Sequence, residues 1–278
     1  MAERTITVLV EDTANRRGLL AEHGLAFWIE LGGKRVLFDT GQGVALGSNA
    51  AQLGIRLEQA DAIVLSHGHY DHTGGLGEAV AAAPSVPVYA HPAAYLQKYA
   101  RNPDGTAREI GMLNRDRDGV HAQGALVWVD GPTEVCEGLM LTGPVPRTTD
   151  FEDTGGAFFR DQACTEPDDL VDDQAAFIEG ANGTHVILGC AHAGIINALQ
   201  YVRTLTGSRP IHTVVGGMHL LHASPVRVGR TVDELRRLGV SRLVPCHCTG
   251  LAATVRLWSE FPDACASCPV GTVLDLAE

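Results

Sequence analysis

Three shortages in the sequence each exclude a class of function. No run of eighteen apolar residues occurs, so we expect no membrane-spanning helix and no membrane partner. Residues 1–5 lead straight into a strand-like segment and lack the apolar core of a signal peptide. Basic residues are few, because 21 Lys and Arg stand against 33 Asp and Glu, a formal charge of −12. Nucleic-acid binding needs clustered Lys and Arg, so we expect no nucleic-acid partner.

Cysteine usage and chain length limit the remaining classes. Seven cysteines are an odd number, and without a secretory signal they indicate reduced thiols and a cytoplasmic location. A chain of 278 residues can bury a full core, and no linker-like segment divides it, so we predict a single domain over residues 1–278. The expected partner is a small-molecule substrate, and the sequence leaves a homodimer open.

Hydrophobic periodicity predicts strands grouped early in the chain and alternating strands and helices later. Strands are expected at residues 6–10, 25–29, 34–38, 62–65, 86–90, 126–129, 139–141, 175–178, 185–188, 211–215, 242–245 and 270–274. Helices are expected at residues 48–53, 76–83, 92–100, 194–206, 226–238 and 249–260. This order predicts an α/β fold in which two sheets pack face to face beneath outer helices. Two polar segments, residues about 92–124 and 147–173, are predicted to be insertion loops that cap a binding site.

The densest group of reactive side chains directly follows the predicted strand 62–65. Four potential metal ligands, His67, His69, Asp71 and His72, occur within six residues and precede a glycine-rich turn. They lie on the loop that leaves the carboxyl end of a strand, where open α/β sheets usually place their binding sites. Imidazole and carboxylate ligands suit zinc, iron or manganese better than calcium or magnesium. The spacing therefore predicts a transition-metal site.

Two more histidines, His192 and His247, each follow a predicted strand and precede a predicted helix. Because this is the position of the first motif too, we expect all three segments to share one cleft. Cys246 and Cys248 flank His247, and on an extended backbone both would point away from its side chain, as core thiols do. Cys190 lies two residues before His192, so its side chain could share the face of His192 or pack in the core, and the sequence does not decide between these two positions.

Together these residues resemble the motif series of the metallo-β-lactamase fold superfamily. The resemblance covers nearly the whole chain from residue 25 onward and rests on Asp39, the run His67-x-His69-x-Asp71-His72, His192 and His247. Several stretches are similar to one subgroup, named after an archaeal dihydropteroate-synthase-like enzyme of methanopterin synthesis: Glu22-His23-Gly24-Leu25, Leu37-Phe38-Asp39-Thr40-Gly41-Gln42, Cys190-Ala191-His192, Gly216-Gly217-Met218-His219-Leu220 and Cys246-His247-Cys248-Thr249-Gly250. The resemblance implies a four-layer αββα sandwich that holds two divalent metal ions, Zn²⁺ first, with Mn²⁺ and Fe²⁺ as alternatives.

Carried over position by position, the resemblance implies two metal sites and one orienting carboxylate. The first site would comprise His67, His69 and His192, and the second Asp71, His72 and His247, with Asp39 orienting a ligand imidazole. Most members of the superfamily also carry an aspartate that bridges the two metals, after the strand that corresponds to residues 211–215. This chain has Gly216-Gly217-Met218-His219 there. We therefore expect a bridge of water or hydroxide alone, or a contribution from His219, and two sites of unequal strength.

The predicted function is a metal-dependent hydrolase that attacks a small polar molecule with a metal-bound hydroxide at a dinuclear site. Asp71 would accept a hydrogen bond from the attacking water, and His219 or His23 would protonate the leaving group. Two alternatives remain open. One is a pterin-type transferase that condenses a pterin electrophile with an aromatic amine, as the subgroup suggests. The other is a non-catalytic ligand-binding module on the same fold.

Overall fold

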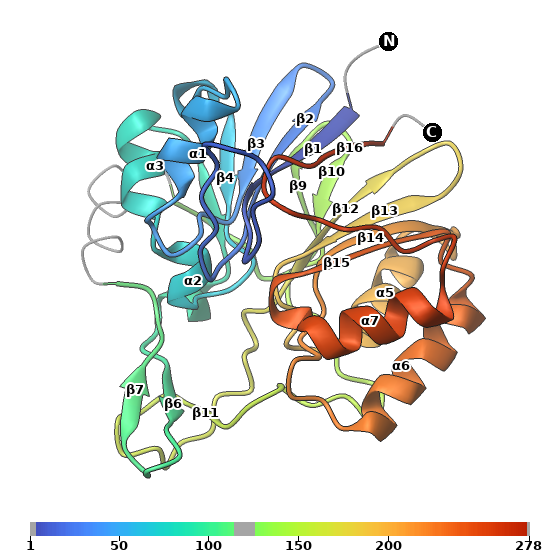
Figure 1. Cartoon of the computed structure of the whole chain (residues 1–278). Coiled ribbons are helices and arrows are strands. Elements are labelled where there is room, and N and C mark those ends of the chain that lie inside the picture. Colours follow the sequence, from blue (N-terminus) through green and yellow to red (C-terminus); the bar gives the residue numbers. More distant parts are fainter. Residues whose placement is uncertain (1–3, 114–125, 277–278) are drawn as a thin grey trace.

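Two large sheets face each other in the computed structural model, which describes residues 4–113 and 126–276 (Figure 1). Within these residues, the first sheet has seven strands in the order β16 (Val273–Asp275), β1 (Arg4–Val10), β2 (Ala26–Leu31), β3 (Lys34–Phe38), β4 (Ala62–Val64), β5 (Val88–Ala90) and β8 (Leu126–Trp128). The second has six in the order β15 (Arg242–Cys246), β14 (Ile211–Gly217), β13 (Thr184–Leu188), β12 (Ala175–Glu179), β10 (Leu139–Leu141) and β9 (Thr133–Cys136).

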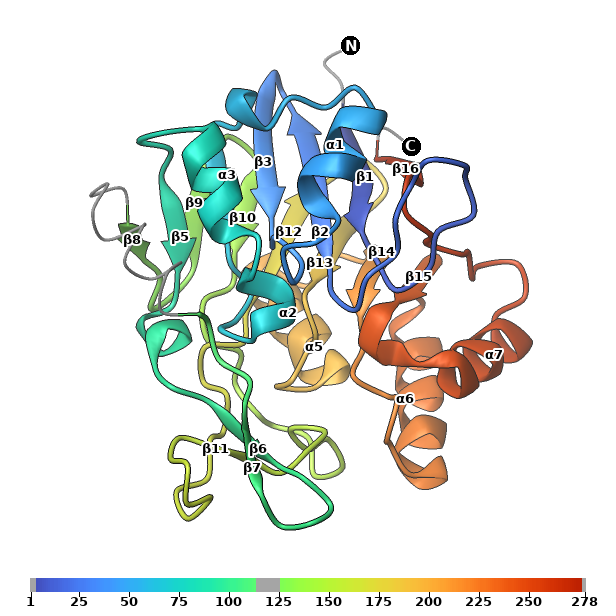
Figure 2. The same cartoon turned by 60° about the vertical axis from the view of Figure 1, so that its left-hand side comes forward.

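Helices cover the outer face of each sheet (Figure 2). The first sheet packs on α1 (Leu46–Gln52) and α3 (Leu76–Ala82), and the second on α5 (Ile195–Leu205), α6 (Pro225–Leu238) and α7 (Leu251–Glu260). Four short elements join these layers: α2 (Tyr70–Thr73) and the 3₁₀ turns η1 (Leu57–Gln59), η2 (Pro92–Tyr95) and η3 (His247–Thr249). The four layers confirm the predicted αββα sandwich. Of the helices described, none has both the length and the apolar character that crossing a bilayer requires.

Strand β2 shows how burial on both faces of a sheet explains an apolar stretch of sequence. Its side chains alternate between two cores: Phe27 and Ile29 pack between the sheets, whereas Ala26 and Trp28 pack beneath α1 and α3. Successive side chains of a strand point to opposite faces, so residues 26–29, which are covered on both faces, are all apolar. The continuous apolar run of the sequence follows from this double burial.

The long helices of the second half begin and end at recognisable residues. Ser224 Oγ accepts the N–H of Arg227 at the start of α6, Pro225 occupies its first turn, and Gly239 ends it with a φ of +67°. The start of α5 is capped from a distance, because the Glu152 carboxylate accepts two of its backbone N–H groups at 2.9 Å. This cap ties the segment 147–173 to the second sheet.

The site lies where the carboxyl ends of several strands meet. Strands β3 and β4 are parallel in the first sheet, and β13, β14 and β15 are parallel in the second. The loop that carries His67, His69, Asp71 and His72, called the motif loop, follows β4. Cys190 and His192 follow β13, and His247 follows β15. The topology therefore brings the three predicted segments to one edge of the sandwich.

The two predicted insertion loops contain strands that the sequence did not reveal. β6 (Tyr99–Arg101), β7 (Ala107–Glu109) and β11 (Phe158–Phe159) form a small third sheet beneath the sandwich in Figure 1. The prediction of loops was wrong here because strands of two or three residues are too short to show a readable apolar alternation. Residues 114–124 of the first predicted loop lie outside the described residues.

Candidate metal centre

The first predicted metal site is assembled from residues on two loops. One potential ligand atom from each of His67, His69 and His192 lies within 4.8 Å of the other two. His67 Nε2 is 3.0 Å from His69 Nδ1, and the ring centroids of His67 and His192 are 4.8 Å apart. All three side chains are buried. We call these three residues the first trio.

The second predicted site is assembled beside it. Asp71 Oδ2 lies 3.4 Å from His247 Nε2 and 3.9 Å from His72 Nε2, and the two Nε2 atoms are 3.3 Å apart. Asp71, His72 and His247 are called the second trio. The ring centroids of His67 and His72 are 4.3 Å apart, so the two trios adjoin.

In three of the imidazoles, Nδ1 points away from the centre and its hydrogen-bond partner determines where the ring hydrogen lies. Each Nδ1 faces an oxygen acceptor: His72 faces Asp39 Oδ2 at 2.7 Å, His192 the Thr154 carbonyl at 3.0 Å, and His247 Asp12 Oδ1 at 2.8 Å. An acceptor there requires Nδ1 to carry a hydrogen, so a lone pair is left on Nε2 whenever the ring is neutral. Within the described residues, the buried Nε2 atoms of His69 and His192 have no hydrogen-bond partner. Buried imidazole nitrogens that have no hydrogen-bond partner are positioned to bind a metal cation.

The first trio is uncharged in the folded chain. Burial lowers the pKa of His69 to about 3 and holds the pKa values of His67 and His192 well below the usual range, and neighbouring imidazoles add to the effect. Neutral imidazole is the form that binds metal, so no proton has to leave these rings before a cation enters.

The second trio carries both a charge and a proton. Burial opposes ionisation of Asp71, but the neighbouring imidazoles, His72 foremost, outweigh it and hold the pKa of Asp71 well below its usual range. Burial likewise opposes the charge on His247, but Cys248, Asp12 and Asp71 together hold its pKa well above the usual value. Without metal, a proton on His247 therefore takes the place of a cation beside Asp71, and metal binding must displace it.

The two predicted proton donors occupy different surroundings. His23 is half-exposed, with Nδ1 3.2 Å from Asp12 Oδ2 and Nε2 3.3 Å from Asp71 Oδ2. Its hydrogen bond to Asp12, with that to Asp71, raises its pKa to about 9. His219 has a φ of +45° and packs its ring against that of His192 at 4.1 Å between centroids. Both residues line the same cavity.

Sequence reasoning missed Asp12 and misplaced Cys248. Glu11 and Asp12 follow β1 at the same edge, where the Glu11 carboxylate accepts the His247 N–H at 2.8 Å; their place after a predicted strand was the available signal. Cys246 packs between the sheets as predicted, but Cys248 lines the cavity. The prediction assumed an extended backbone, whereas His247 has a φ of +49° and begins the turn η3.

A cavity of about 320 Å³ opens onto the centre. His69, Asp71, His192 and His247 line it together with both predicted proton donors. The small third sheet supplies Arg101, Arg108 and Phe158 to its wall. The Phe158 ring centroid is 5.2 Å from that of His69 and 5.3 Å from that of His192, so an aromatic face borders the first trio.

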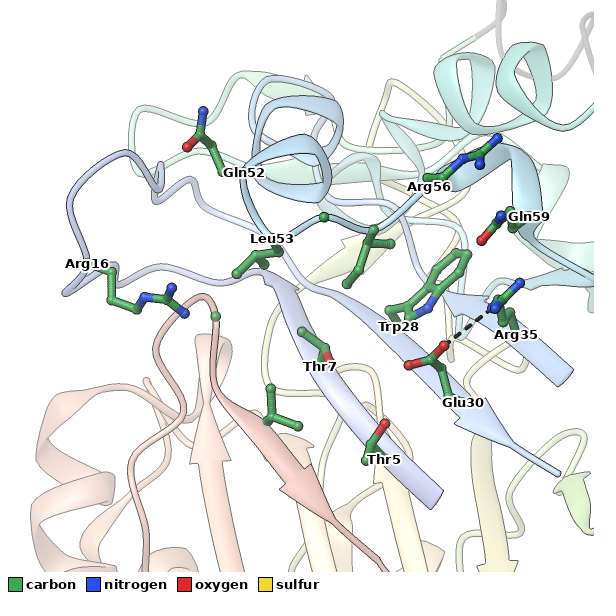
Figure 3. A pocket seen from close by; sticks show the side chains of 14 residues that line it. Thr5, Thr7, Arg16, Trp28, Glu30, Arg35, Gln52, Leu53, Arg56 and Gln59 are labelled. Atoms are coloured by element: carbon green, nitrogen blue, oxygen red, sulfur yellow. Dashed lines mark hydrogen bonds and ion pairs between the residues drawn. The ribbon is translucent and has the colours of Figure 1, made fainter. Parts of the chain in front are cut away.

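A larger cavity, of about 460 Å³, lies on the outer face of the first sheet beside α1 (Figure 3). It is polar, and Figure 3 shows Arg35 paired with Glu30, their atoms 3.3 Å apart. No histidine or cysteine occurs among the described residues that line it. The one carboxylate among these described residues, Glu30, pairs with Arg35, so the lining resembles a metal site less than the smaller cavity does, and size does not identify the functional site here.

A family profile and two relatives match most of the length of this chain. A profile of the metallo-beta-lactamase superfamily matches residues 20–247. An uncharacterized protein of Methanocaldococcus jannaschii is 33% identical over 253 residues, which cover 91% of this chain and 93% of that protein. The 7,8-dihydropterin-6-methyl-4-(beta-D-ribofuranosyl)-aminobenzene-5'-phosphate synthase of the same organism is 30% identical over 271 residues, covering 93% of this chain and 92% of the synthase.

A crystal structure is similar over the whole chain. It is that of a metal-dependent hydrolase of the beta-lactamase superfamily, with a TM-score of 0.84 and 31% sequence identity. The match covers 99% of this chain and 100% of the hydrolase. The likeness therefore extends to the elements that carry both trios.

Proposed function

Because this chain belongs to the metallo-beta-lactamase superfamily, we propose that it hydrolyses a small polar molecule at a centre of two divalent cations. The superfamily profile and the relatives confirm the predicted family and subgroup, and make the chain an enzyme of this fold. The observation that carries the two-metal proposal is the convergence of imidazole Nε2 atoms in a buried centre, with each outward Nδ1 held by an oxygen acceptor.

The first trio would hold one cation and the second trio the other. Imidazole-rich sets favour Zn²⁺, with Mn²⁺ and Fe²⁺ as the alternatives. Divalent cations in such a centre lower the pKa of bound water and polarise a carbonyl or phosphoryl oxygen. The proton on His247 makes the second trio the weaker site in this proposal, because binding there must displace it.

The residues of the chain would orient water and deliver the proton. Asp71 would accept a hydrogen bond from the attacking water, since its carboxylate stays ionised at the cavity wall. His23 retains its proton at neutral pH and lies within reach of the same cavity, so it would protonate the leaving group. His219 is the second candidate donor, and its Nδ1 has no hydrogen-bond partner in the described chain.

The cavity favours a substrate with a negative group. Its volume of about 320 Å³ suits a small molecule. Arg101 and Arg108 line it, although the chain as a whole carries a formal charge of −12. Guanidinium groups bind carboxylate and phosphate oxygens in a fixed geometry, so an anionic ester or lactone is the preferred substrate class.

A pterin-type transferase is the second candidate. The observation that favours it is the 30% identity with the Methanocaldococcus jannaschii synthase, whose name denotes a dihydropterin joined to a substituted aminobenzene. Such a reaction would use the same cavity, with Phe158 available to stack on a planar ring.

A substrate screen decides between the two. Protein reconstituted with Zn²⁺, Mn²⁺ or Fe²⁺ is assayed against anionic and neutral esters, lactones, phosphodiesters and β-lactams, and in parallel against a dihydropterin electrophile with an aromatic amine. We expect metal-dependent hydrolysis, fastest with anionic substrates. Condensation without hydrolysis would replace the hydrolase by the transferase, and folded protein that binds no metal would refute both.

A further inference from the structure

Cys190 lies at the junction of the two trios. Its Sγ is 3.0 Å from His72 Nε2. Three groups of potential ligand atoms, each with its members within 4.8 Å of one another, include this cysteine: Cys190 with His67 and His72, with His192 and His219, and with His247 and Cys248. One sulfur atom therefore neighbours ligand atoms of both trios.

The backbone around Cys190 is shaped to put its sulfur there. Gly189 passes so close to the motif loop that a Cβ on it would lie 2.0 Å from Ser66 Oγ. Ala191, with a φ of +54°, then turns the chain in the left-handed region, which few residues other than glycine adopt. This turn directs Cys190 and His192, two residues apart, into one centre.

The surroundings of Cys190 differ from those of a core thiol. A buried cysteine usually packs as a small apolar side chain, as Cys246 does between the sheets. The Cys190 sulfur instead meets His72 Nε2, and the Nδ1 of the same ring faces Asp39 Oδ2. Cys248 Sγ also approaches, at 3.7 Å from the Cys190 carbonyl oxygen. The thiol is thus surrounded by potential metal ligands.

We propose that the Cys190 thiolate is a ligand shared by the two metal ions, an inference that rests on the two-metal function proposed above. Zinc binds sulfur at about 2.3 Å and nitrogen at about 2.0–2.1 Å, so neighbouring donors of one ion lie about 3–3.5 Å apart, and water would take a fifth position on each ion. The spacing of Cys190 from both trios is compatible with that geometry. Binding releases the thiol proton to solvent, and a thiolate selects zinc over magnesium or manganese.

The first test needs no variant. Wild-type protein loaded with Co²⁺ should show a thiolate-to-cobalt charge-transfer band in the near ultraviolet. Zinc-loaded protein should show a sulfur neighbour at about 2.3 Å in X-ray absorption, and the sulfur should persist when both sites are filled. Two bound metals with only nitrogen and oxygen neighbours would overturn the role of Cys190 and leave the proposed function standing. Absence of bound metal would overturn both.

Serine variants of three cysteines identify which residue supplies the metal-bound sulfur. Cys190→Ser should abolish the cobalt band and lower the metal content toward one equivalent, whereas Cys246→Ser and Cys248→Ser should keep the band. Circular dichroism checks that each variant is folded. A band that survives in Cys190→Ser, or that disappears only in Cys248→Ser, would overturn the assignment.

Discussion

A buried carboxylate organises the metal-binding motif from behind. Asp39 is fully buried, and its two oxygens accept hydrogen bonds from His72 Nδ1, the Ser66 N–H and the Ser66 hydroxyl, all at 2.7 Å. It has a φ of +59°, a backbone region that aspartate tolerates better than most residues. Asp39 thereby fixes the ring of His72 and the start of the motif loop together.

Replacing Asp39 by asparagine should weaken metal binding without abolishing it. The amide retains the shape of the carboxylate but not its charge, and comparable losses behind metal ligands reduce affinity roughly 10–100-fold. Competition titration with a chromophoric chelator measures the change. Asp61→Asn is the control, because Asp61 also accepts a backbone N–H but lies at the surface. An unchanged dissociation constant for Asp39→Asn would contradict the orienting role.

Replacing His69 by alanine should remove one metal equivalent and reduce turnover to background. His69 contributes a buried Nε2 without a hydrogen-bond partner among the described atoms, so the fold loses little when it is removed. Elemental analysis, circular dichroism and the hydrolase assay together check this. His212→Ala, at the opposite end of β14, should behave as wild type. Retained activity in His69→Ala would exclude it as a ligand.

At the scale of elements, a buried lysine holds the segment 147–173 against the motif loop. Lys98 Nζ lies 2.8 Å from Asp172 Oδ1 and 3.0 Å from Asp168 Oδ2, and its side chain is 1% exposed. Asp172 Oδ2 also accepts the N–H of Gly68, which stands between two first-trio histidines. The cluster thus joins three segments distant in sequence.

Replacing Lys98 by methionine should destabilise the fold by about 3–5 kcal/mol, because two buried carboxylates lose their counter-charge. Chemical denaturation measures the free energy of unfolding. The control is Lys34→Met, which breaks the exposed pair with Asp61 and should change the free energy of unfolding far less, because solvent screens that pair. Equal effects of the two variants would show that Lys98 does not stabilise this junction.

His185 on β13 should make stability depend on pH. Burial, with a smaller effect of His212, lowers its folded-state pKa to about 4, from 6.5 in an unfolded chain. Between these values the unfolded chain binds more protons, so this contribution is complete above pH 6.5 and is lost as the pH falls toward 4. At most it amounts to about 3 kcal/mol.

Denaturation of metal-free protein between pH 4 and 7 tests this contribution. His185→Asn should reduce the slope without abolishing it, because the neutral first trio contributes in the same direction, whereas His222→Asn, at an exposed position, should retain the wild-type slope. Parallel curves for wild type and His185→Asn would show that His185 is not held neutral by the fold.

At the scale of the whole molecule, metal binding should stabilise the sandwich. Both trios join loops from the two facing sheets, so a bound cation links them across the edge. Zn²⁺ at 100 times its dissociation constant should raise the free energy of unfolding by about 2.7 kcal/mol per site. Thermal melting before and after chelation measures this. An unchanged melting temperature in wild type would contradict a native metal centre, and His69→Ala should show the smaller shift.

The accuracy of the sequence-based predictions differs from one structural element to another. Helix 194–206 was predicted within one residue of α5, because its apolar periodicity and flanking glycine are local signals. The third sheet was missed because its strands, of two or three residues each, are too short to show a periodic pattern. Cys248 was misplaced because a single left-handed residue, His247, breaks the alternation on which the prediction depended.

The sequence by itself determined the layered fold and the six candidate ligands, because periodicity and the placement of ligands after strands are local properties. Only the tertiary structure decided which nitrogen of each ring faces inward and where Cys190 lies. His247 and Asp12 are 235 positions apart, and Cys190 and His72 are 118 apart. Contacts across such distances depend on how the two sheets pack, and no local pattern encodes that packing.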